Sequence, residues 1–243
     1  GGDDRSPPMF APLLASRGCA RRCSVCSIHT FYRTAPGKVV RTRKPEKIIE
    51  EMLLLQRQFG IRVFLFQDDD FPLWGPAGRR WAAELTDRMH ESGLANRAVW
   101  KISCRGEYVE SELFKSLRDA GLFLVYMGIE SGVEQGLKIL HKDMTVQGNL
   151  EAVRVLKETG LLVSYGFMLF DPSSTFDSVR ENIQFLRRIV GDGSTAATFC
   201  RMLPYGGTPI RELLQREGRL RGDLTHPDYL LLDTRRQEYH RLL

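Results

Sequence analysis

The chain has 243 residues, of which 42% are apolar and 27% charged, so it can bury a core of ordinary size without a disulfide framework. Lysine and arginine number 35 against 30 aspartates and glutamates, and the net charge of +5 suits an anionic substrate without indicating a nucleic-acid-binding protein. No apolar run approaches about 18 residues, so we expect no transmembrane helix.

The first residues are polar and proline-rich, do not begin with methionine, and show no signal-peptide pattern. We interpret residues 1–9 as a linker or a remnant of cloning. The apolar run that follows, residues 10–16, is short and strand-like, and it leads into a loop that contains three cysteines.

Beyond this loop, helix-like and strand-like segments alternate. Pro45 opens a helix, since proline is well tolerated in the first helical turn. Apolar residues then repeat at spacings of four, three and four from Ile48 to Phe59, and Gly60 ends the helix. Further helical repeats cover 81–89, 113–120, 150–156 and 179–190. The predicted strands are 10–16, 61–67, 98–103, 122–129, 161–170 and 195–203.

The alternation of strands and helices implies parallel strands joined by right-handed crossovers. The strands are apolar on nearly every residue, as expected when both faces of a sheet are covered. We therefore predict an α/β fold, a partial (β/α)6 TIM-type barrel over residues 10–206 with a C-terminal helical extension over 207–243. A doubly wound open sheet is the competing fold, but no Gly-x-Gly-x-x-Gly pattern follows the first strand.

Polar side chains follow every predicted strand, at the end where barrel enzymes build their active sites. Period-two alternation places Lys101, Ser103 and Arg105 on one face of the third strand, and Ile102 and Cys104 on the other. Because the outer face must meet helices, we expect the polar face to look into the barrel and Cys104 to be a buried, inert thiol. The same count groups Gln67 with Asp69, and Tyr126 with Gly128 and Glu130. Any one of these side chains could equally cap a turn.

The three cysteines of the loop, Cys19, Cys23 and Cys26, have the order Cys-x3-Cys-x2-Cys. Thiolates suit an iron–sulfur cluster or zinc, and both belong in a reducing compartment. A structural zinc site needs four ligands, and His29 is the only nearby candidate for the fourth. Ferredoxin clusters also take four cysteines, with different spacing. Three thiolates on a [4Fe-4S] cluster leave one iron open, which favours chemistry over a structural role.

At this point the sequence resembles a known family. The run SRGCARRCSVCSI at 16–28 is similar to the signature of the radical S-adenosylmethionine (radical SAM) superfamily. The resemblance extends over nearly the whole chain through FQDDDF at 66–71, GIESG at 128–132 followed by LKILHKDMT, and PYGGTP at 204–209. This combination resembles the cobalamin-associated subgroup, which includes methyltransferases and anaerobic ring cyclases.

The resemblance implies an enzyme whose cluster, bound by the three cysteines, chelates S-adenosylmethionine at its open iron. Reductive cleavage would then give a 5′-deoxyadenosyl radical that abstracts hydrogen from a substrate held in the barrel. Many members carry an aromatic residue at the position of Val25, so one expected packing contact is missing here. The implied contacts to S-adenosylmethionine are the Val25 backbone at adenine, Gln67 and Asp69 at the methionine end, Arg105 at the carboxylate, and Glu130 and Ser131 at the ribose or methionine moiety.

The resemblance also implies C-methylation or ring formation on a small-molecule substrate, with an electron donor such as flavodoxin or ferredoxin in the cytoplasm. We expect no nucleic-acid partner. A radical SAM enzyme acting on RNA or peptide, and a non-catalytic iron–sulfur or zinc module, stay open as alternatives. In the subgroup a cobalamin domain normally precedes the barrel, whereas here the first strand begins near Phe10. We therefore expect either that the chain is a fragment and cobalamin comes through a domain outside it, or that the barrel works without cobalamin.

Overall fold

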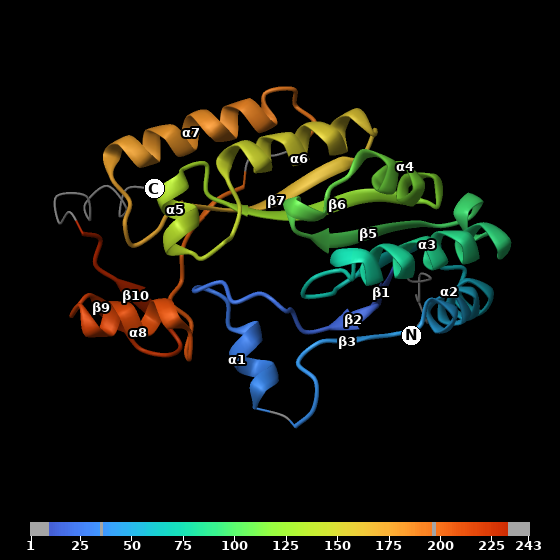
Figure 1. Cartoon of the computed structure of the whole chain (residues 1–243), viewed down its shortest axis with the longest axis horizontal. Helices are drawn as coiled ribbons and strands as arrows, with labels where there is room; N and C mark the ends of the chain where they lie inside the picture. The colour runs from blue at the N-terminus through green and yellow to red at the C-terminus, as the bar shows by residue number, and fades with distance from the viewer. Residues whose placement is uncertain (1–9, 35, 196–197, 233–243) are drawn as a thin grey trace, which may run out of the picture. The chain divides into compact units, whose positions relative to one another are not determined.

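A computed structural model of the chain describes residues 10–34, 36–195 and 198–232. Its largest sheet has six strands in the order β1-β4-β5-β6-β7-β8 (Figure 1). The pairings of β1 with β4, β4 with β5, β5 with β6 and β7 with β8 are parallel, which confirms the predicted α/β fold with a partial-barrel sheet. The strands are β1 (Ala11–Leu13), β4 (Val63–Phe66), β5 (Val99–Cys104), β6 (Leu122–Glu130), β7 (Leu162–Phe170) and β8 (Cys200–Arg201).

Helices occupy every crossover between consecutive strands of this sheet, as the sequence pattern predicts. The first long helix begins at Pro45 and is followed by Gly60 in the left-handed conformation, with a φ of 69°. No helix in the described ranges combines the length and the apolar character that a membrane span requires. The helices are α1 (Ile28–Arg33), α2 (Pro45–Phe59), α3 (Gly75–Glu91), α4 (Ser111–Asp119), α5 (Glu134–Ile139), α6 (Val146–Glu158) and α7 (Phe176–Val190), with short 3-10 helices η1 (Leu94–Asn96) and η2 (Gly106–Tyr108).

The described residues form two compact units. The border between the units runs through strands β6 and β7, because each of these strands contributes residues to both. Unit 1 comprises 10–18, 40–127 and 154–164, and unit 2 comprises 19–34, 36–39, 128–153, 165–195 and 198–232.

Unit 1 has an aromatic core centred on Trp100 of β5. Its indole is fully buried, and Nε1 donates a hydrogen bond to the Ala120 carbonyl at 2.9 Å. The rings of Phe66 and Phe71 lie 5.8 and 6.0 Å from the indole, within the range of favourable aromatic pairs. Helices α2 and α3 pack against each other in the same unit (Figure 1). This packing explains why β5 buries one face completely.

The close approach at Gly121, just after α4, provides a test of this packing. Gly121 has a φ of 103°, and a Cβ there would lie 2.6 Å from the Ala98 carbonyl oxygen. We expect Gly121→Ala to lower the free energy of unfolding by about 2–4 kcal/mol, since strained backbone and a forced shift add. In Gly60→Ala nothing lies within 4 Å, so only the left-handed backbone cost of about 1–2 kcal/mol applies. Urea denaturation compares the two variants, and equal losses would contradict this account.

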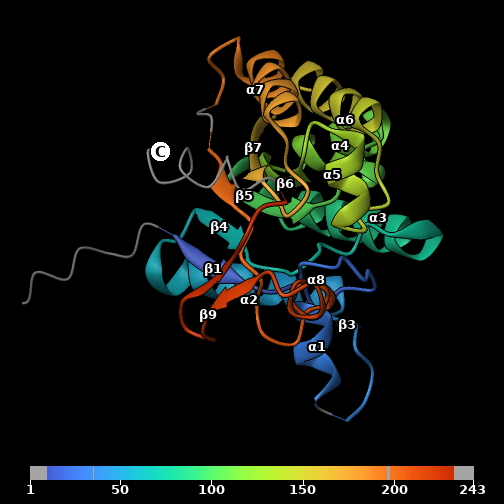
Figure 2. The ribbon, with the colours of Figure 1, turned by 90° about the vertical axis from the view of Figure 1, so that its left-hand side faces the viewer.

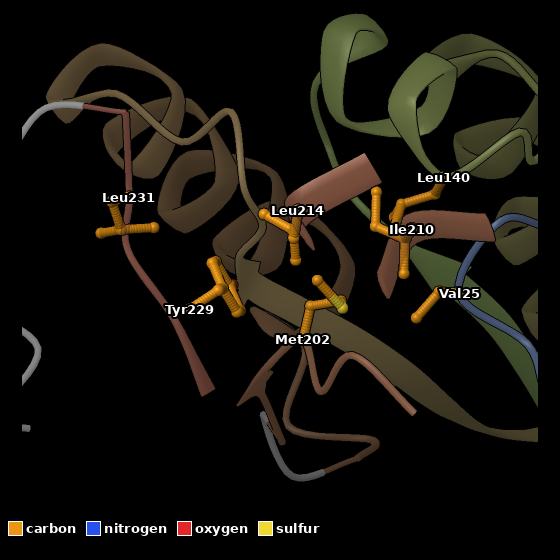
Figure 3. Close-up of a cluster of buried hydrophobic side chains, with 7 residues drawn as sticks. All are labelled: Val25, Leu140, Met202, Ile210, Leu214, Tyr229 and Leu231. Atoms are coloured by element: carbon orange, nitrogen blue, oxygen red, sulfur yellow. The ribbon is translucent and has the colours of Figure 1, made fainter. Parts of the chain in front are cut away.

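Unit 2 is built around a cluster of seven buried apolar residues (Figure 3). The C-terminal part of the chain supplies four of them, from helix α8 (Pro209–Arg216) and from the strand β10 region. Strand β9 (Leu220–Gly222) pairs with β10 (Pro227–Tyr229) as an antiparallel hairpin beside α8 (Figure 1), and Figure 2 shows α8 and β9 from another side. The cluster consists of Val25, Leu140, Met202, Ile210, Leu214, Tyr229 and Leu231.

Two predictions about the C-terminal part need correction. The extension over 207–243 is only partly helical, because Gly218 and Gly222 turn the chain at φ values of 67° and 68° and a hairpin follows α8. Residues 233–243 lie outside the described part. Among the described residues of the strand predicted over 195–203, only Cys200 and Arg201 belong to β8, and Phe199 and Leu203 are both exposed.

Candidate functional site

The three cysteines lie between β2 (Ser16–Arg17) and α1, at the start of unit 2. All three side chains are partly exposed. Within the loop the Cys26 amide donates to the Cys23 carbonyl at 3.2 Å, and the Arg21 amide donates to Cys19 Sγ at 3.4 Å. Amide hydrogen bonds to sulfur are a recurring feature of iron–sulfur sites, where they tune the cluster.

The cysteine loop is held in place by the two residues between its second and third cysteines. The Ser24 amide donates to the Leu140 carbonyl at 3.0 Å, and Ser24 Oγ donates to the Ile139 carbonyl at 2.6 Å. On the other side, the Ile210 amide donates to the Ser24 carbonyl at 3.0 Å. The Val25 side chain is buried in the apolar cluster, beside Leu140 and Ile210 (Figure 3). The packing contact that the sequence suggested was missing is thus made by an aliphatic side chain.

Within the part of the chain that the structure describes, no group of three Cys, His, Asp or Glu side chains is arranged to hold a single metal ion. Zinc gathers its ligands around a single point, whereas a four-iron cluster takes its thiolates at different irons. His29, the suggested fourth zinc ligand, has both ring nitrogens enclosed without a hydrogen-bond partner among the described residues.

The acidic turn after β4 fixes the backbone that leads into the cysteine loop. Asp68 is buried and accepts hydrogen bonds from the Ala15 amide at 3.2 Å, from Ser16 Oγ at 2.6 Å and from the Ser16 amide. Burial raises the pKa of the Asp68 carboxyl, and the Ser16 and Ala15 bonds oppose that shift. Asp69 Oδ2 accepts from the Gly18 amide at 2.8 Å. Residues 15–18, which directly precede Cys19, are thus tied to the end of β4.

Gln67 and Asp69 are exposed while Asp68 and Asp70 are buried, so the alternation predicted for this segment is confirmed. The structure adds that Asp69 already has a role inside the protein, since it holds Gly18. The sequence offered no signal for this contact, because it joins residues 51 positions apart.

The register predicted for the third strand, β5, is also confirmed. Ile102 and Cys104 are buried, and burial, followed by the Asp70 charge, raises the pKa of the Cys104 thiol. On the opposite face Lys101 Nζ donates to Ser103 Oγ at 2.9 Å. Cys104 is therefore a packed and unreactive thiol, as expected.

Arg105 follows β5 and is 6% exposed. Its guanidinium is paired with the Glu107 carboxylate at 2.9 Å. A buried guanidinium can bind a further carboxylate through two hydrogen bonds. Here that carboxylate would be the second negative group beside Arg105, so the surroundings must balance the charge.

Glu130 ends β6 in an unusual conformation. Its φ is 68°, in the left-handed region that non-glycine residues rarely adopt. Its carboxylate is paired with Lys142 Nζ at 3.1 Å, and the two side chains are 17% and 9% exposed. His141 and Asp143, on either side of Lys142, also have positive φ values, 49° and 51°. Strained residues cluster at functional sites, because only surrounding contacts can hold them.

One short stretch of chain contacts both the cysteine loop and Glu130. We call residues 139–143 the bridging segment. Ile139 and Leu140 accept the Ser24 hydrogen bonds, and Lys142 pairs with Glu130. Sequence analysis missed Ser24 and Lys142 as site residues, although both stand inside the stretches that carry the family resemblance.

Ser131 is fully buried, and its hydroxyl is used inside the protein. Ser131 Oγ lies 3.3 Å from Asn182 Oδ1 and accepts from the Val133 amide at 3.1 Å. Asn182 also accepts from the Gly132 amide at 2.7 Å. These bonds shape the turn after Glu130.

The predicted site residues are divided between the two units. Gln67, Asp69 and Arg105 belong to unit 1. Within unit 2 the bridging segment contacts Ser24 of the cysteine loop and Glu130. This unit holds the larger part of the predicted set: Cys19, Cys23, Cys26, Val25, Glu130 and Ser131.

Comparison with known proteins identifies one family. The model of the Radical SAM superfamily matches residues 13–186. An uncharacterized methyltransferase of Pyrococcus horikoshii is 30% identical over 203 residues, covering 84% of this chain and 41% of the relative. The anaerobic magnesium-protoporphyrin IX monomethyl ester cyclase of Cereibacter sphaeroides is 29% identical over 168 residues, covering 68% of this chain and 26% of the cyclase. The chain thus spans less than half the length of these relatives.

A solved structure shares the fold. The cobalamin-dependent S-adenosylmethionine radical enzyme OxsB, with aqua-cobalamin and S-adenosylmethionine bound, superimposes with a TM-score of 0.79 at 17% identity. The match covers 95% of this chain and 40% of OxsB. At this identity the likeness establishes the partial-barrel architecture alone.

Proposed function

This chain belongs to the radical SAM superfamily, whose cofactors are a [4Fe-4S] cluster and S-adenosylmethionine, and we propose that Cys19, Cys23 and Cys26 bind that cluster. When bound, the cluster supplies an open iron for S-adenosylmethionine and the electron that cleaves it to a 5′-deoxyadenosyl radical. The observation that carries the proposal is the anchoring of Ser24 and Val25, which orders the loop through the residues between its second and third cysteines.

S-adenosylmethionine carries an ammonium, a carboxylate and a ribose diol, so its site must offer both acceptors and donors. In unit 2 we assign the Glu130 carboxylate to the ribose or methionine moiety and the Val25 backbone to adenine. The left-handed backbone of Glu130 and its pairing with Lys142 fix the direction of this carboxylate. Ser131 contributes by shaping the turn that follows Glu130.

In unit 1 we assign Gln67 and Asp69 to the methionine end and Arg105 to the methionine carboxylate. Gln67 and Asp69 are exposed on one face of the chain after β4, and Asp69 also positions Gly18 before the first cysteine. A guanidinium matches a carboxylate through two parallel hydrogen bonds, which is why Arg105 is the chosen partner.

We further propose C-methylation or ring formation on a small molecule as the reaction of the whole protein. Named relatives include methyltransferases and a ring cyclase, which supports this choice. Cobalamin, which the OxsB structure contains, would act through a part of the protein outside this chain. A thiolate-bound cluster needs a reducing compartment, so we place the protein in the cytoplasm, with flavodoxin or ferredoxin as its electron donor.

The proposal is tested by reconstituting the chain anaerobically with iron and sulfide and reducing it in the presence of S-adenosylmethionine. We expect about four irons per chain and release of 5′-deoxyadenosine and methionine. A second readout is the spectrum of the reduced cluster, which should change when S-adenosylmethionine is added. A fully loaded cluster whose spectrum does not respond, and which releases no 5′-deoxyadenosine, would identify a non-catalytic module instead.

A further inference from the structure

Unit 1 contains a hollow of about 800 Å³ beside β1, and Gln67 is the one described lining residue that the proposed function assigns to S-adenosylmethionine. Its volume lies within the range of small-molecule pockets. Strand β2 and strand β3 (Arg41–Thr42), which lie side by side in Figure 1, both contribute residues to its lining. We call this hollow the arginine cleft, because three of its lining residues are Arg17, Arg41 and Arg43.

Two of these arginines stand directly opposite each other. In the antiparallel β2–β3 ladder Arg17 pairs with Arg41, and Ser16 pairs with Thr42. Residues directly opposite on such a ladder project from the same face, with Cβ atoms about 4.5–5.5 Å apart. Both arginines are exposed and both line the cleft. The two guanidinium groups can therefore reach one group bound between them.

The third guanidinium is held in place by the protein. Arg43 donates to the Leu14 carbonyl at 2.9 Å and is paired with the Glu51 carboxylate at 2.6 Å. The Arg43 carbonyl accepts from Trp81 Nε1 at 2.8 Å, which fixes its backbone as well. Among the described residues that line the cleft, Glu51 is acidic and Arg17, Arg41 and Arg43 are basic.

The remaining walls suit the rest of a small molecule. Thr42 and Gln67 bring a hydroxyl and an amide to the cleft, and Pro12 and Leu14 of the β1 region bring apolar surface. A ligand with a carbon skeleton and an oxyanion at one end would therefore find contacts for both parts.

We propose that the arginine cleft binds the oxyanion of a small molecule, a phosphate or a carboxylate group, through Arg17 and Arg41. Guanidinium forks match both groups through two parallel hydrogen bonds, which a lysine cannot reproduce. The binding needs no cluster turnover, so the cleft can be tested whether or not the proposed radical chemistry is found.

The test is calorimetric titration of the reconstituted chain with pyrophosphate in one arm and glutarate in the other. The arm that binds distinguishes a phosphate ligand from a carboxylate ligand. In the double variant Arg17→Gln/Arg41→Gln we expect the affinity to fall at least about tenfold, because each lost charged hydrogen bond costs roughly that factor or more. The double variant Arg17→Lys/Arg41→Lys should bind the probe with an affinity between those of the wild type and the Gln/Gln variant. It keeps both charges but loses the two parallel hydrogen bonds of each guanidinium.

Arg80→Gln, on the exposed surface of α3 and outside the lining, is the matched control and should bind the probe like the wild type. The Gln/Gln variant should keep a melting temperature close to that of the wild type, because both side chains are exposed. The proposal is overturned if neither probe binds the wild-type chain, or if the Gln/Gln variant binds as well as the wild type. It is also overturned if that variant loses affinity for S-adenosylmethionine to the same extent, because the cleft would then serve the cofactor's own carboxylate.

Discussion

Replacing Cys23 by Ala is expected to abolish stable cluster binding and, with it, formation of 5′-deoxyadenosine. Each of the three thiolates is assigned to one iron, so the loss of one thiolate leaves that iron without its protein ligand. Iron and acid-labile sulfide per chain after reconstitution, and 5′-deoxyadenosine released after reduction, measure the effect. Cys19→Ala and Cys26→Ala are expected to behave in the same way.

Cys104→Ala is the matched control, because it removes a buried thiol, whereas the three thiols of the loop are partly exposed. Cys104 is 5% exposed and lies on the buried face of β5. We therefore expect a small loss of stability, about 1 kcal/mol, and full iron content. Loss of the cluster in Cys104→Ala would show that the strand register, and the choice of ligands that depends on it, is wrong. Retention of the cluster in Cys23→Ala would contradict the assignment directly.

Lys142→Met is expected to lower the free energy of unfolding by about 3 kcal/mol and to weaken binding of S-adenosylmethionine. Lys142 and Glu130 are both largely buried, and removing one partner of such a pair leaves the other charge uncompensated. The change also removes the contact that holds Glu130 in its left-handed conformation. Urea denaturation measures the first effect, and equilibrium dialysis with labelled S-adenosylmethionine measures the second.

Two further variants separate this account from a general loss of packing. Lys138→Met, on the exposed surface of α5, should change neither quantity. Lys142→Met/Glu130→Gln should recover part of the lost stability, because the unpaired charge is gone, while the affinity for S-adenosylmethionine stays low. If the double variant is less stable than Lys142→Met, the ion pair is not the source of the effect.

Much of the fold could be predicted because parallel strands and their helices carry strong local patterns. The period-two count on β5 placed Ile102 and Cys104 correctly, since one face of a covered strand must be apolar. The C-terminal region was harder, because its hairpin depends on glycine turns inside a polar stretch that has helical repeats only over α8. Phe199, an apolar residue in a predicted strand, is exposed, so an apolar run alone did not locate β8.

Only those features of the candidate site that follow from residue spacing or from the family resemblance could be predicted. The cysteines stand within eight residues, so their order alone indicates a shared ligand set. The Ser24 to Ile139 hydrogen bond joins residues 115 positions apart, and no local pattern records such a contact. Lys142 lies inside the quoted run LKILHKDMT, but its pairing with Glu130 depends on the left-handed backbone of His141 and Asp143. Histidine and aspartate adopt this conformation too rarely for it to be predicted from the sequence.

The bridging segment makes the cysteine loop and Glu130 thermodynamically linked. Leu140 and Lys142 are two residues apart. The carbonyl that accepts the Ser24 hydrogen bond and the ammonium that pairs with Glu130 therefore belong to the same short segment of chain. Linkage is reciprocal, so a ligand that is bound more tightly when Glu130 is in place also tightens the loop that carries the cysteines, by the same free energy. Loading the cluster should therefore raise the affinity for S-adenosylmethionine even apart from any bond to iron, and the cofactor should in turn slow loss of the cluster.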